Sequence, residues 1–180
     1  MNHDTVASVA TPLELALLPV RPLPAVNYRA DIKLVRLPVS EVREDAPRLE
    51  LSGAAAVADY MAGAFDAFPD QEQMWAILLN RRNRPIGRQL CSVGTGHNAL
   101  ATPVILFRAA ILASAAGVIL AHNHPSGIPE PSSADMRVAR QLKEAARTVE
   151  IDLLDFIILG SRAADPAGLG YYSFRTAGLL

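Results

Sequence analysis

The apolar run VILA at residues 118–121 restricts the possible folds of this chain more than any other stretch. An apolar residue at every position means that both sides of the segment must be buried, which is typical of an interior strand in a covered sheet. Gly117 precedes the run and Pro125 follows it closely, and both residue types interrupt regular structure. We therefore predict an interior β-strand that ends at His122.

Segments with helical periodicity alternate with further strand-like segments along the chain. The predicted strands cover residues 72–80, 86–94, 118–122 and 151–160, with a short last strand at 171–174. The predicted helices begin at Ser52, as the N-cap of residues 53–65, at Thr102, with Pro103 in the first turn, and at Ser132 or Ser133. The second helix should run to about residue 116 and end at Gly117. This alternation predicts an α/β fold of three layers, in which helices flank a central mixed sheet.

The first 45 residues differ from the rest in composition. They are rich in proline and show no sustained hydrophobic period, and residues 31–39, DIKLVRLPV, are their one piece able to pair as a strand. A chain of 180 residues has room for one domain of ordinary size and a tail. We predict a loosely ordered N-terminal arm at 1–45 and a single domain at 46–180.

Charge and cysteine content exclude several classes of protein. A net charge of −1 provides no general attraction to nucleic acid or anionic lipid. The single cysteine, Cys91, excludes an intramolecular disulfide framework and a cysteine-rich zinc site. It fits a reducing compartment, and with no targeting signal recognised we expect a cytoplasmic protein.

Residues 99–121 are the one stretch long and apolar enough to raise the question of a membrane span. Pro103 and Gly117 interrupt it, and Arg108 near its centre would cost roughly 2.5 to 3.5 kcal/mol in a membrane-spanning helix. The segment therefore reads as a buried helix followed by a buried strand, and no contact with a membrane is expected.

The predicted interior strand ends in His122-Asn123-His124. Because side chains alternate along a strand, both imidazoles should lie on one face, with Asn123 pointing away. Two neighbouring imidazoles are a common start to a zinc site, and the loop that follows is long enough to bring Asp135 back over the strand end. Two histidines and one carboxylate would leave the fourth tetrahedral position of a zinc ion for water, which is typical of a catalytic site.

Each part of this pattern also has a purely structural explanation. An isolated His-x-His is more often structural or fortuitous than metal-binding. Ser132-x-x-Asp135 ahead of an apolar run has the spacing of a helix capping box, with Asp in place of the usual Glu or Gln. Taken one at a time, the residues leave both interpretations open.

The complete string resembles the signature of the JAMM (JAB/MPN+) metalloproteins: His122-x-His124-Pro125, then Ser132, then Asp135. Within that family, AHNHPSG...PS..D is most similar to the bacterial RadC-like branch. The resemblance runs from about residue 50 to the C-terminus and includes SVGT at 92–95, LLD at 153–155 and the final YYSFRTAGLL.

The resemblance implies a JAB/MPN-like fold, related in architecture to the deaminases, and a Zn²⁺ ion held by His122, His124 and Asp135. It implies that Glu72 is the general acid and base of a hydrolase, taking a proton from the zinc-bound water and returning it to the leaving amine. Ser132 would donate a hydrogen bond to the oxyanion. The substrate it implies is a peptide or isopeptide bond in a peptide or protein modifier.

The chain also departs from the RadC-like pattern. Phe156 stands where the family typically has His, and Val104 stands where it usually has Arg. Nothing in residues 1–45 resembles the helix-hairpin-helix portion that these chains often carry. These departures leave the proposed metal ligands untouched, but they weaken any inference about DNA.

Several other functions compete with a zinc hydrolase. A non-enzymatic binding module on a JAB scaffold, or a DNA-associated RadC-type protein, remains the alternative. The literal HNH at 122–124 does not indicate an HNH nuclease, whose three residues are spread over a larger unit, and a zinc deaminase needs a cysteine pair that this chain lacks. His97 is read as a solvated loop residue and His3 as part of the arm.

Arginines 81, 82, 84 and 88 form the one basic cluster of the sequence, around a predicted hairpin turn. The default interpretation of Arg81, Arg82, Arg84 and Arg88 is a solvated turn. A weak, salt-sensitive contact with nucleic acid or an acidic partner is the alternative, and specific DNA binding is not expected.

Overall fold

The computed structural model describes residues 50–94 and 102–180. The predicted arm at 1–45, its strand-like piece, His3 and His97 lie outside these residues. The predictions that concern them are therefore not tested.

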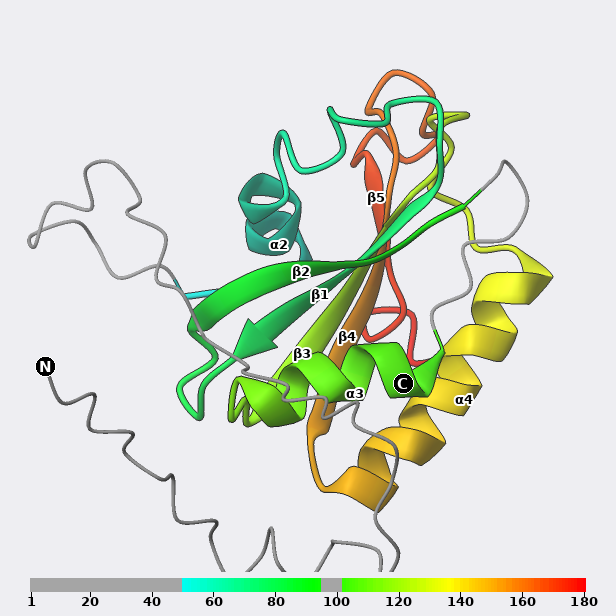
Figure 1. Cartoon of the computed structure of the whole chain (residues 1–180). Coiled ribbons are helices and arrows are strands. Elements are labelled where there is room, and N and C mark those ends of the chain that lie inside the picture. Colours follow the sequence, from blue (N-terminus) through cyan, green and yellow to red (C-terminus); the bar gives the residue numbers. More distant parts are fainter. Residues whose placement is uncertain (1–49, 95–101) are drawn as a thin grey trace, which may run out of the picture. The chain divides into compact units, whose positions relative to one another are not determined.

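A mixed sheet with strand order β2-β1-β3-β4-β5 forms the centre of the domain (Figure 1). Its strands are β1 (Gln73–Leu79), β2 (Pro85–Val93), β3 (Gly117–Asn123), β4 (Asp152–Leu159) and β5 (Tyr171–Ser173). Strands β3 and β4 are parallel, whereas the other neighbouring pairs are antiparallel. All five predicted strands are present, and β1 and β2 form the predicted hairpin around residues 80–84.

Strand β3 lies between β1 and β4, and every one of its residues is buried. This confirms the interior strand predicted from the apolar run at 118–121. Residues on its two faces alternate between the two parts of the core: Leu120 belongs to one hydrophobic cluster and Ile119 to the other. The central strand thus has no solvent-exposed side, as its composition requires.

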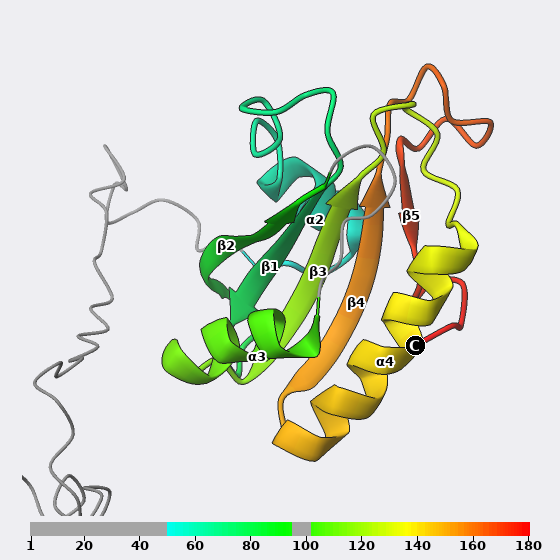
Figure 2. The ribbon, with the colours of Figure 1, turned by 45° about the vertical axis from the view of Figure 1, so that its right-hand side comes forward.

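Helices cover both faces of the sheet and complete the three layers (Figures 1 and 2). Helix α2 (Ala54–Tyr60) covers one face, and α3 (Pro103–Leu112) and α4 (Ser133–Val149) cover the other. The apolar residues on the α2 side include Val57, Met61, Ile77, Ile119 and Ile157. Those on the α3 and α4 side include Leu106, Leu120, Leu142, Phe156 and Phe174. The predicted three-layer α/β fold with a mixed sheet is confirmed.

Two helix boundaries differ from the predicted ones. The N-cap of α2 is Gly53 rather than Ser52, and no side chain caps this helix, which ends at Tyr60. Helix α3 ends at Leu112, well before Gly117. Ser114 adopts a left-handed conformation with φ of 52°, and the Ala116 N–H donates to the carbonyl of Leu79 on β1.

Gly117 is the first residue of β3 and does not terminate a helix. A Cβ there would lie 3.3 Å from the carbonyl oxygen of Asp152 and 3.2 Å from a methyl group of Leu154, so the glycine allows close packing against β4. Pairing with the sheet therefore ends α3 earlier than local sequence signals suggest.

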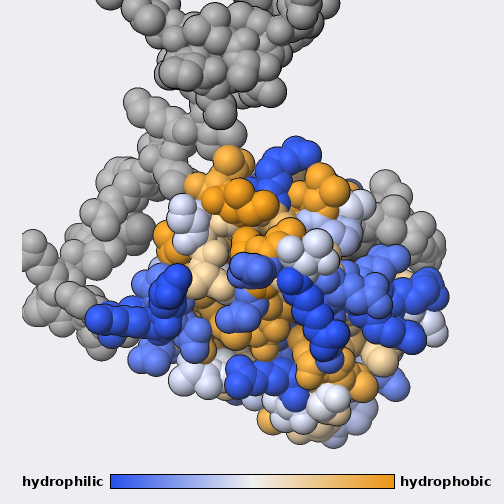
Figure 3. Space-filling model, turned by 90° about the horizontal axis from the view of Figure 1, so that it is seen from below, coloured by the Kyte–Doolittle hydropathy of each residue, from blue (hydrophilic) through white to orange (hydrophobic). Residues whose placement is uncertain are grey.

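No helix in the described ranges 50–94 and 102–180 is long and apolar enough to cross a membrane. The apolar stretch considered above is divided, from Pro103 onward, into α3 and β3, as predicted. Figure 3 views the domain from the side of α3 and α4 and shows hydrophobic residues exposed among hydrophilic ones. Val104 and Ile111 of α3 and Val149 of α4 are exposed apolar residues of these two helices.

Candidate metal centre

The carboxyl end of β3 places two imidazoles side by side. The centroids of the His122 and His124 rings lie 4.9 Å apart, and the ring planes are perpendicular. The ring of His122 also lies 6.4 Å from that of Phe156, within the core on the α4 side of the sheet. The Asn123 side chain instead hydrogen-bonds to the backbone of Gln71 and Gln73. The predicted alternation of these three side chains is confirmed.

His122 is almost completely buried, with 2% of its surface exposed. Burial lowers the pKa of this imidazole to about 4, although the nearby Asp135 carboxylate acts in the opposite direction. Its Nδ1 atom is buried and has no hydrogen-bond partner among the described residues. His122 is therefore neutral at physiological pH, the state in which imidazole binds metals.

His124 is oriented by the loop that follows it. Its Nδ1 lies 2.8 Å from the carbonyl oxygen of Ile128, and its backbone N–H donates to the carbonyl of Leu159. A ring that donates Nδ1–H to a carbonyl leaves the Nε2 lone pair free for a metal. Burial acts to lower the pKa of His124, but the Asp135 carboxylate, the Ile128 carbonyl and the charge of Glu72 together raise it.

The loop that orients His124 depends on two glycines. Gly127 has φ of 81°, which L side chains rarely adopt, and its carbonyl accepts a hydrogen bond of 2.7 Å from the Ser161 N–H. A Cβ on Gly160 would overlap the Gly127 carbonyl. Backbone of the loop after β3 thus packs directly against the chain that leaves β4.

The first turn of α4 brings Asp135 to both imidazoles. One carboxylate oxygen lies 3.6 Å from Nε2 of His122 and the other lies 3.6 Å from Nε2 of His124. Asp135 is 5% exposed, and burial acts to raise its pKa. The neighbouring His124 and the hydrogen bonds from Ser132 outweigh burial and lower this pKa to about 2, so the side chain is an anion.

Ser132 and Asp135 also form the capping box predicted from their spacing. The Ser132 hydroxyl donates to the Asp135 carboxylate at 2.6 Å and accepts from the Asp135 N–H at 3.2 Å, and the Ser132 N–H donates to the same carboxylate at 2.8 Å. The cap and the metal-ligand interpretations of Asp135 are therefore compatible in one geometry. The Ser132 hydroxyl has only one proton, however, and in this structure it donates that proton in its hydrogen bond to the Asp135 carboxylate.

Glu72 lies immediately before β1, half-buried. Antiparallel pairing sets Met74 opposite His122, which brings the start of β1 to the end of β3. As a result, one ligating atom from each of Glu72, His122 and His124 lies within 4.8 Å of the others. This group could hold a metal ion, with the Asp135 carboxylate beside both histidines.

The dimensions of the site suit a small tetrahedral ion. Ligands at about 2.0 to 2.1 Å from a zinc ion are separated from one another by about 3.3 Å in a tetrahedral site. Each imidazole Nε2 lies 3.6 Å from a carboxylate oxygen of Asp135, from Oδ1 for His122 and from Oδ2 for His124, which is close to this spacing. A neutral buried imidazole, a second one with its Nδ1 position held, and an ionised carboxylate are donors that could hold a metal ion.

The buried Asn123 and Gln73 were not anticipated as parts of the site. Gln73 is fully buried on the α2 side, and its amide nitrogen donates to the carbonyls of Phe65 and Phe68. The contacts of Asn123 and Gln73 depend on how β1 pairs with β3, and the local sequence does not reveal that pairing. The only sequence signal was an amide residue between two histidines at the end of an apolar strand.

Of the four candidate arginines, Arg88 contacts residues outside the hairpin turn. Arg88 donates to the carbonyl of Tyr60 at 2.7 Å, and its guanidinium lies 5.5 Å from the Tyr60 ring centroid and 5.7 Å from that of Trp75. Arg81 and Arg82 are exposed at the hairpin turn, and Arg84 is partly buried. Contact with nucleic acid or an acidic partner stays a prediction.

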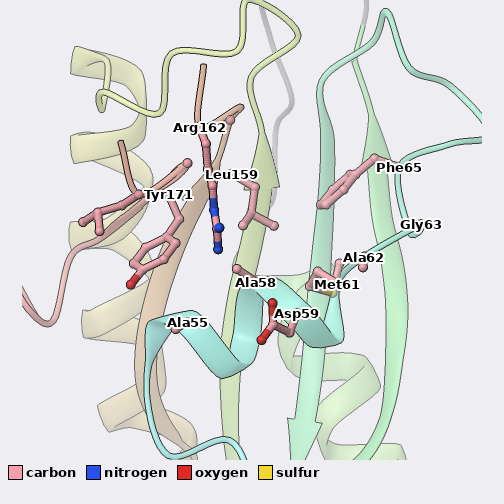
Figure 4. A pocket seen from close by; sticks show the side chains of 13 residues that line it. Ala55, Ala58, Asp59, Met61, Ala62, Gly63, Phe65, Leu159, Arg162 and Tyr171 are labelled. Carbon is pink, nitrogen blue, oxygen red and sulfur yellow. The ribbon is translucent and has the colours of Figure 1, made fainter. Parts of the chain in front are cut away.

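A separate pocket of about 300 Å³ lies on the α2 side of the sheet (Figure 4). Figure 4 shows Asp59 of α2 and Arg162 extending into this pocket from opposite sides. None of the predicted site residues lines it. The candidate metal centre and this pocket are distinct features of the domain.

Comparison with known proteins identifies relatives of the whole described domain. Residues 51–179 match the model of the family described as the RadC-like JAB domain. The chain is 43% identical over 133 residues to a UPF0758 protein of Pelodictyon phaeoclathratiforme, an alignment covering 73% of this chain and 55% of that protein. It is 41% identical over 133 residues to a UPF0758 protein of Symbiobacterium thermophilum, with 74% and 53% covered.

This chain spans about half the length of these curated relatives. The name UPF0758 does not describe an activity. The match over residues 51–179, together with the geometry at the end of β3, nevertheless establishes the family. The chain belongs to the RadC-like JAB domain family.

Proposed function

We propose that this protein is a zinc-dependent hydrolase that cleaves an amide bond, either a peptide or an isopeptide bond, with Glu72 as general acid and base. The observation that carries the proposal is the convergence of Glu72, His122, His124 and Asp135 at the end of β3. These residues come from the start of one strand, the end of another and the first turn of a helix. Family membership supports the same assignment.

His122, His124 and Asp135 would hold the zinc ion. A bound zinc ion with an open position lowers the pKa of its water toward ~7 and polarises a substrate carbonyl. Glu72, whose carboxylate oxygen lies within 4.8 Å of the imidazole ligand atoms, would accept a proton from the attacking water. The same carboxyl group would then return the proton to the leaving amine, which restores Glu72 to its starting state.

Ser132 is the proposed oxyanion donor. It is exposed at the start of α4, but its hydroxyl donates a hydrogen bond to the Asp135 carboxylate in this structure. Stabilising an oxyanion therefore requires the hydroxyl to turn away from Asp135. The backbone N–H of Ser132 would keep its own bond to the carboxylate, so the cap would be only partly lost.

The substrate we propose is a peptide or a protein modifier, and the single Cys91 fits action in the reducing cytoplasm. The alternative is a binding module or a DNA-associated protein that keeps the JAB fold without turnover. An intact group of ligands and base favours the hydrolase, because helix capping accounts for Asp135 but not for the carboxylate of Glu72 near the two histidines.

The test is incubation of the purified zinc-loaded protein with peptide, isopeptide and DNA substrates, in parallel with Glu72→Gln. Cleavage of an amide bond by the wild-type protein, and its loss in Glu72→Gln at equal zinc content, is the expected result. Cleavage of DNA, or no cleavage of any substrate at full zinc occupancy, would overturn the proposal.

A further inference from the structure

Asn123 stands between the two imidazoles, but its side chain points to the strand that carries Glu72. It is 8% exposed. Its Oδ1 accepts a hydrogen bond of 2.6 Å from the backbone N–H of Gln73, and its Nδ2 donates at 3.1 Å to the backbone carbonyl of Gln71. The side-chain amide of Asn123 therefore donates to the segment just before β1 and, at the same time, accepts from the first residue of β1.

These two backbone groups belong to the two peptide units on either side of the Glu72 α-carbon. The Gln71 carbonyl is part of the peptide bond before Glu72, and the Gln73 N–H is part of the peptide bond after it. The Glu72 carbonyl, in the second of these units, also accepts from the Gly94 N–H at 2.8 Å. Both peptide planes at Glu72 are thus fixed, and with them the direction in which its side chain leaves the backbone.

We propose that Asn123 is the positioning residue of Glu72. Because side chains alternate along the chain at the end of β3, His122 and His124 offer ligand atoms on one face of the sheet. Asn123, between them, holds the backbone of Glu72 from the other face. The distance between ligand and base is then set by a single segment of backbone. This inference rests on the proposed function, in which Glu72 moves protons.

The chemistry of the position calls for a carboxamide. Asp would keep the acceptor for the Gln73 N–H but could not, as an anion, donate to the Gln71 carbonyl. Ala would leave both backbone groups without their partner. Because proton transfer requires close alignment, a displacement of about 1 Å at the base can cost on the order of 100-fold in rate.

The experiment introduces Asn123→Ala, Asn123→Asp and the control Ile119→Val into two backgrounds, the wild-type protein and Glu72→Gln. Ile119 is buried on the α2-facing side of β3 and belongs to the hydrophobic cluster beneath α2. Shortening this side chain therefore loosens the packing but removes no hydrogen bond to the backbone at Glu72. We expect Asn123→Ala to lower kcat by about 10-fold to 100-fold, with KM and zinc content unchanged. In the Glu72→Gln background the same substitution should change kcat by less than about twofold, because the group it positions is already inactive.

A second measurement does not depend on turnover. In metal-free protein, amide hydrogen exchange at Gln73 should be faster in Asn123→Ala than in Ile119→Val at matched stability, and should remain slow in Asn123→Asp. Equal kcat losses in both Glu72 backgrounds, or a Gln73 amide as protected in Asn123→Ala as in the control, would overturn the positioning role. Full turnover by zinc-loaded Glu72→Gln would instead overturn the proposed function, and the exchange data would still decide whether Asn123 holds this backbone.

Discussion

The contact between Gly160 and Gly127 predicts that a single methyl group added outside the proposed ligand set will weaken metal binding at the candidate centre. In Gly160→Ala the new Cβ would overlap the Gly127 carbonyl, and it would also touch the ring of Pro129. The obstacle is backbone and a proline ring, neither of which can rotate away. The loop after β3 must therefore move as a unit.

The expected loss of stability follows from this steric conflict. Overpacking of a closely packed site costs typically 1 to 3 kcal/mol, and the rigidity of the contact places Gly160→Ala near the upper end, at about 3 kcal/mol. For a domain of this size that corresponds to a fall in Tm of about 10 °C. The displaced segment includes Ile128, whose carbonyl orients His124, so zinc affinity should fall on the order of 10-fold.

Gly87→Ala is the matched control. A Cβ at Gly87 in β2 would meet nothing within 4 Å, so this substitution should leave stability within about 0.5 kcal/mol of wild type. Urea unfolding of metal-free protein and zinc titration with a competing chelator measure the two effects. Wild-type stability and zinc affinity in Gly160→Ala would refute the argument that backbone contact between these loops holds His124 in place.

Further predictions concern the metal, the base, the cap, the cysteine and DNA. The double variant His122→Ala with His124→Ala should lose the zinc, about one ion per chain in the wild type, when assayed by elemental analysis, whereas stoichiometric zinc in it would exclude this site. Zinc-loaded Glu72→Gln should fold normally and lose about 10² to 10⁴-fold in kcat, and a rate near wild type would remove Glu72 from the mechanism. Ser132→Ala should cost about 1 kcal/mol in urea unfolding through the lost cap and should lower kcat without releasing zinc. Burial raises the pKa of Cys91 to about 11, so its alkylation at pH 8 should be slow until the protein unfolds, and rapid labelling of folded protein would contradict this. Filter binding at physiological salt should show no sequence-selective affinity for DNA.

The parts of the fold that sequence predicts well are those decided by local pattern. An all-apolar run identified β3 as the interior strand, and period-two alternation placed His122 and His124 on one face. The capping box at Ser132 and Asp135 followed from spacing alone. In each of these cases the residues that decide the structure are neighbours in sequence.

The parts that sequence predicts poorly depend on partners far along the chain. Helix α3 stops before Gly117 because the Ala116 N–H pairs with Leu79, a residue of another strand. Glu72 could be selected only through family resemblance, since its approach to the histidines results from the pairing of β1 with β3. The contribution of Asn123 has the same origin, because its partners lie about 50 residues earlier.

Gln73 has a consequence for the fidelity of folding. A shift of β1 by one residue against β3 would move its side chains to the opposite faces and set Gln73 in the place of Glu72. The misregistered protein would then carry an amide in place of the proposed base, and would resemble the Glu72→Gln variant although its sequence is unchanged. In the shifted pairing the Gln73 side chain would lie on the opposite face of the sheet and would lose its hydrogen bonds to the carbonyls of Phe65 and Phe68, which favours the native register.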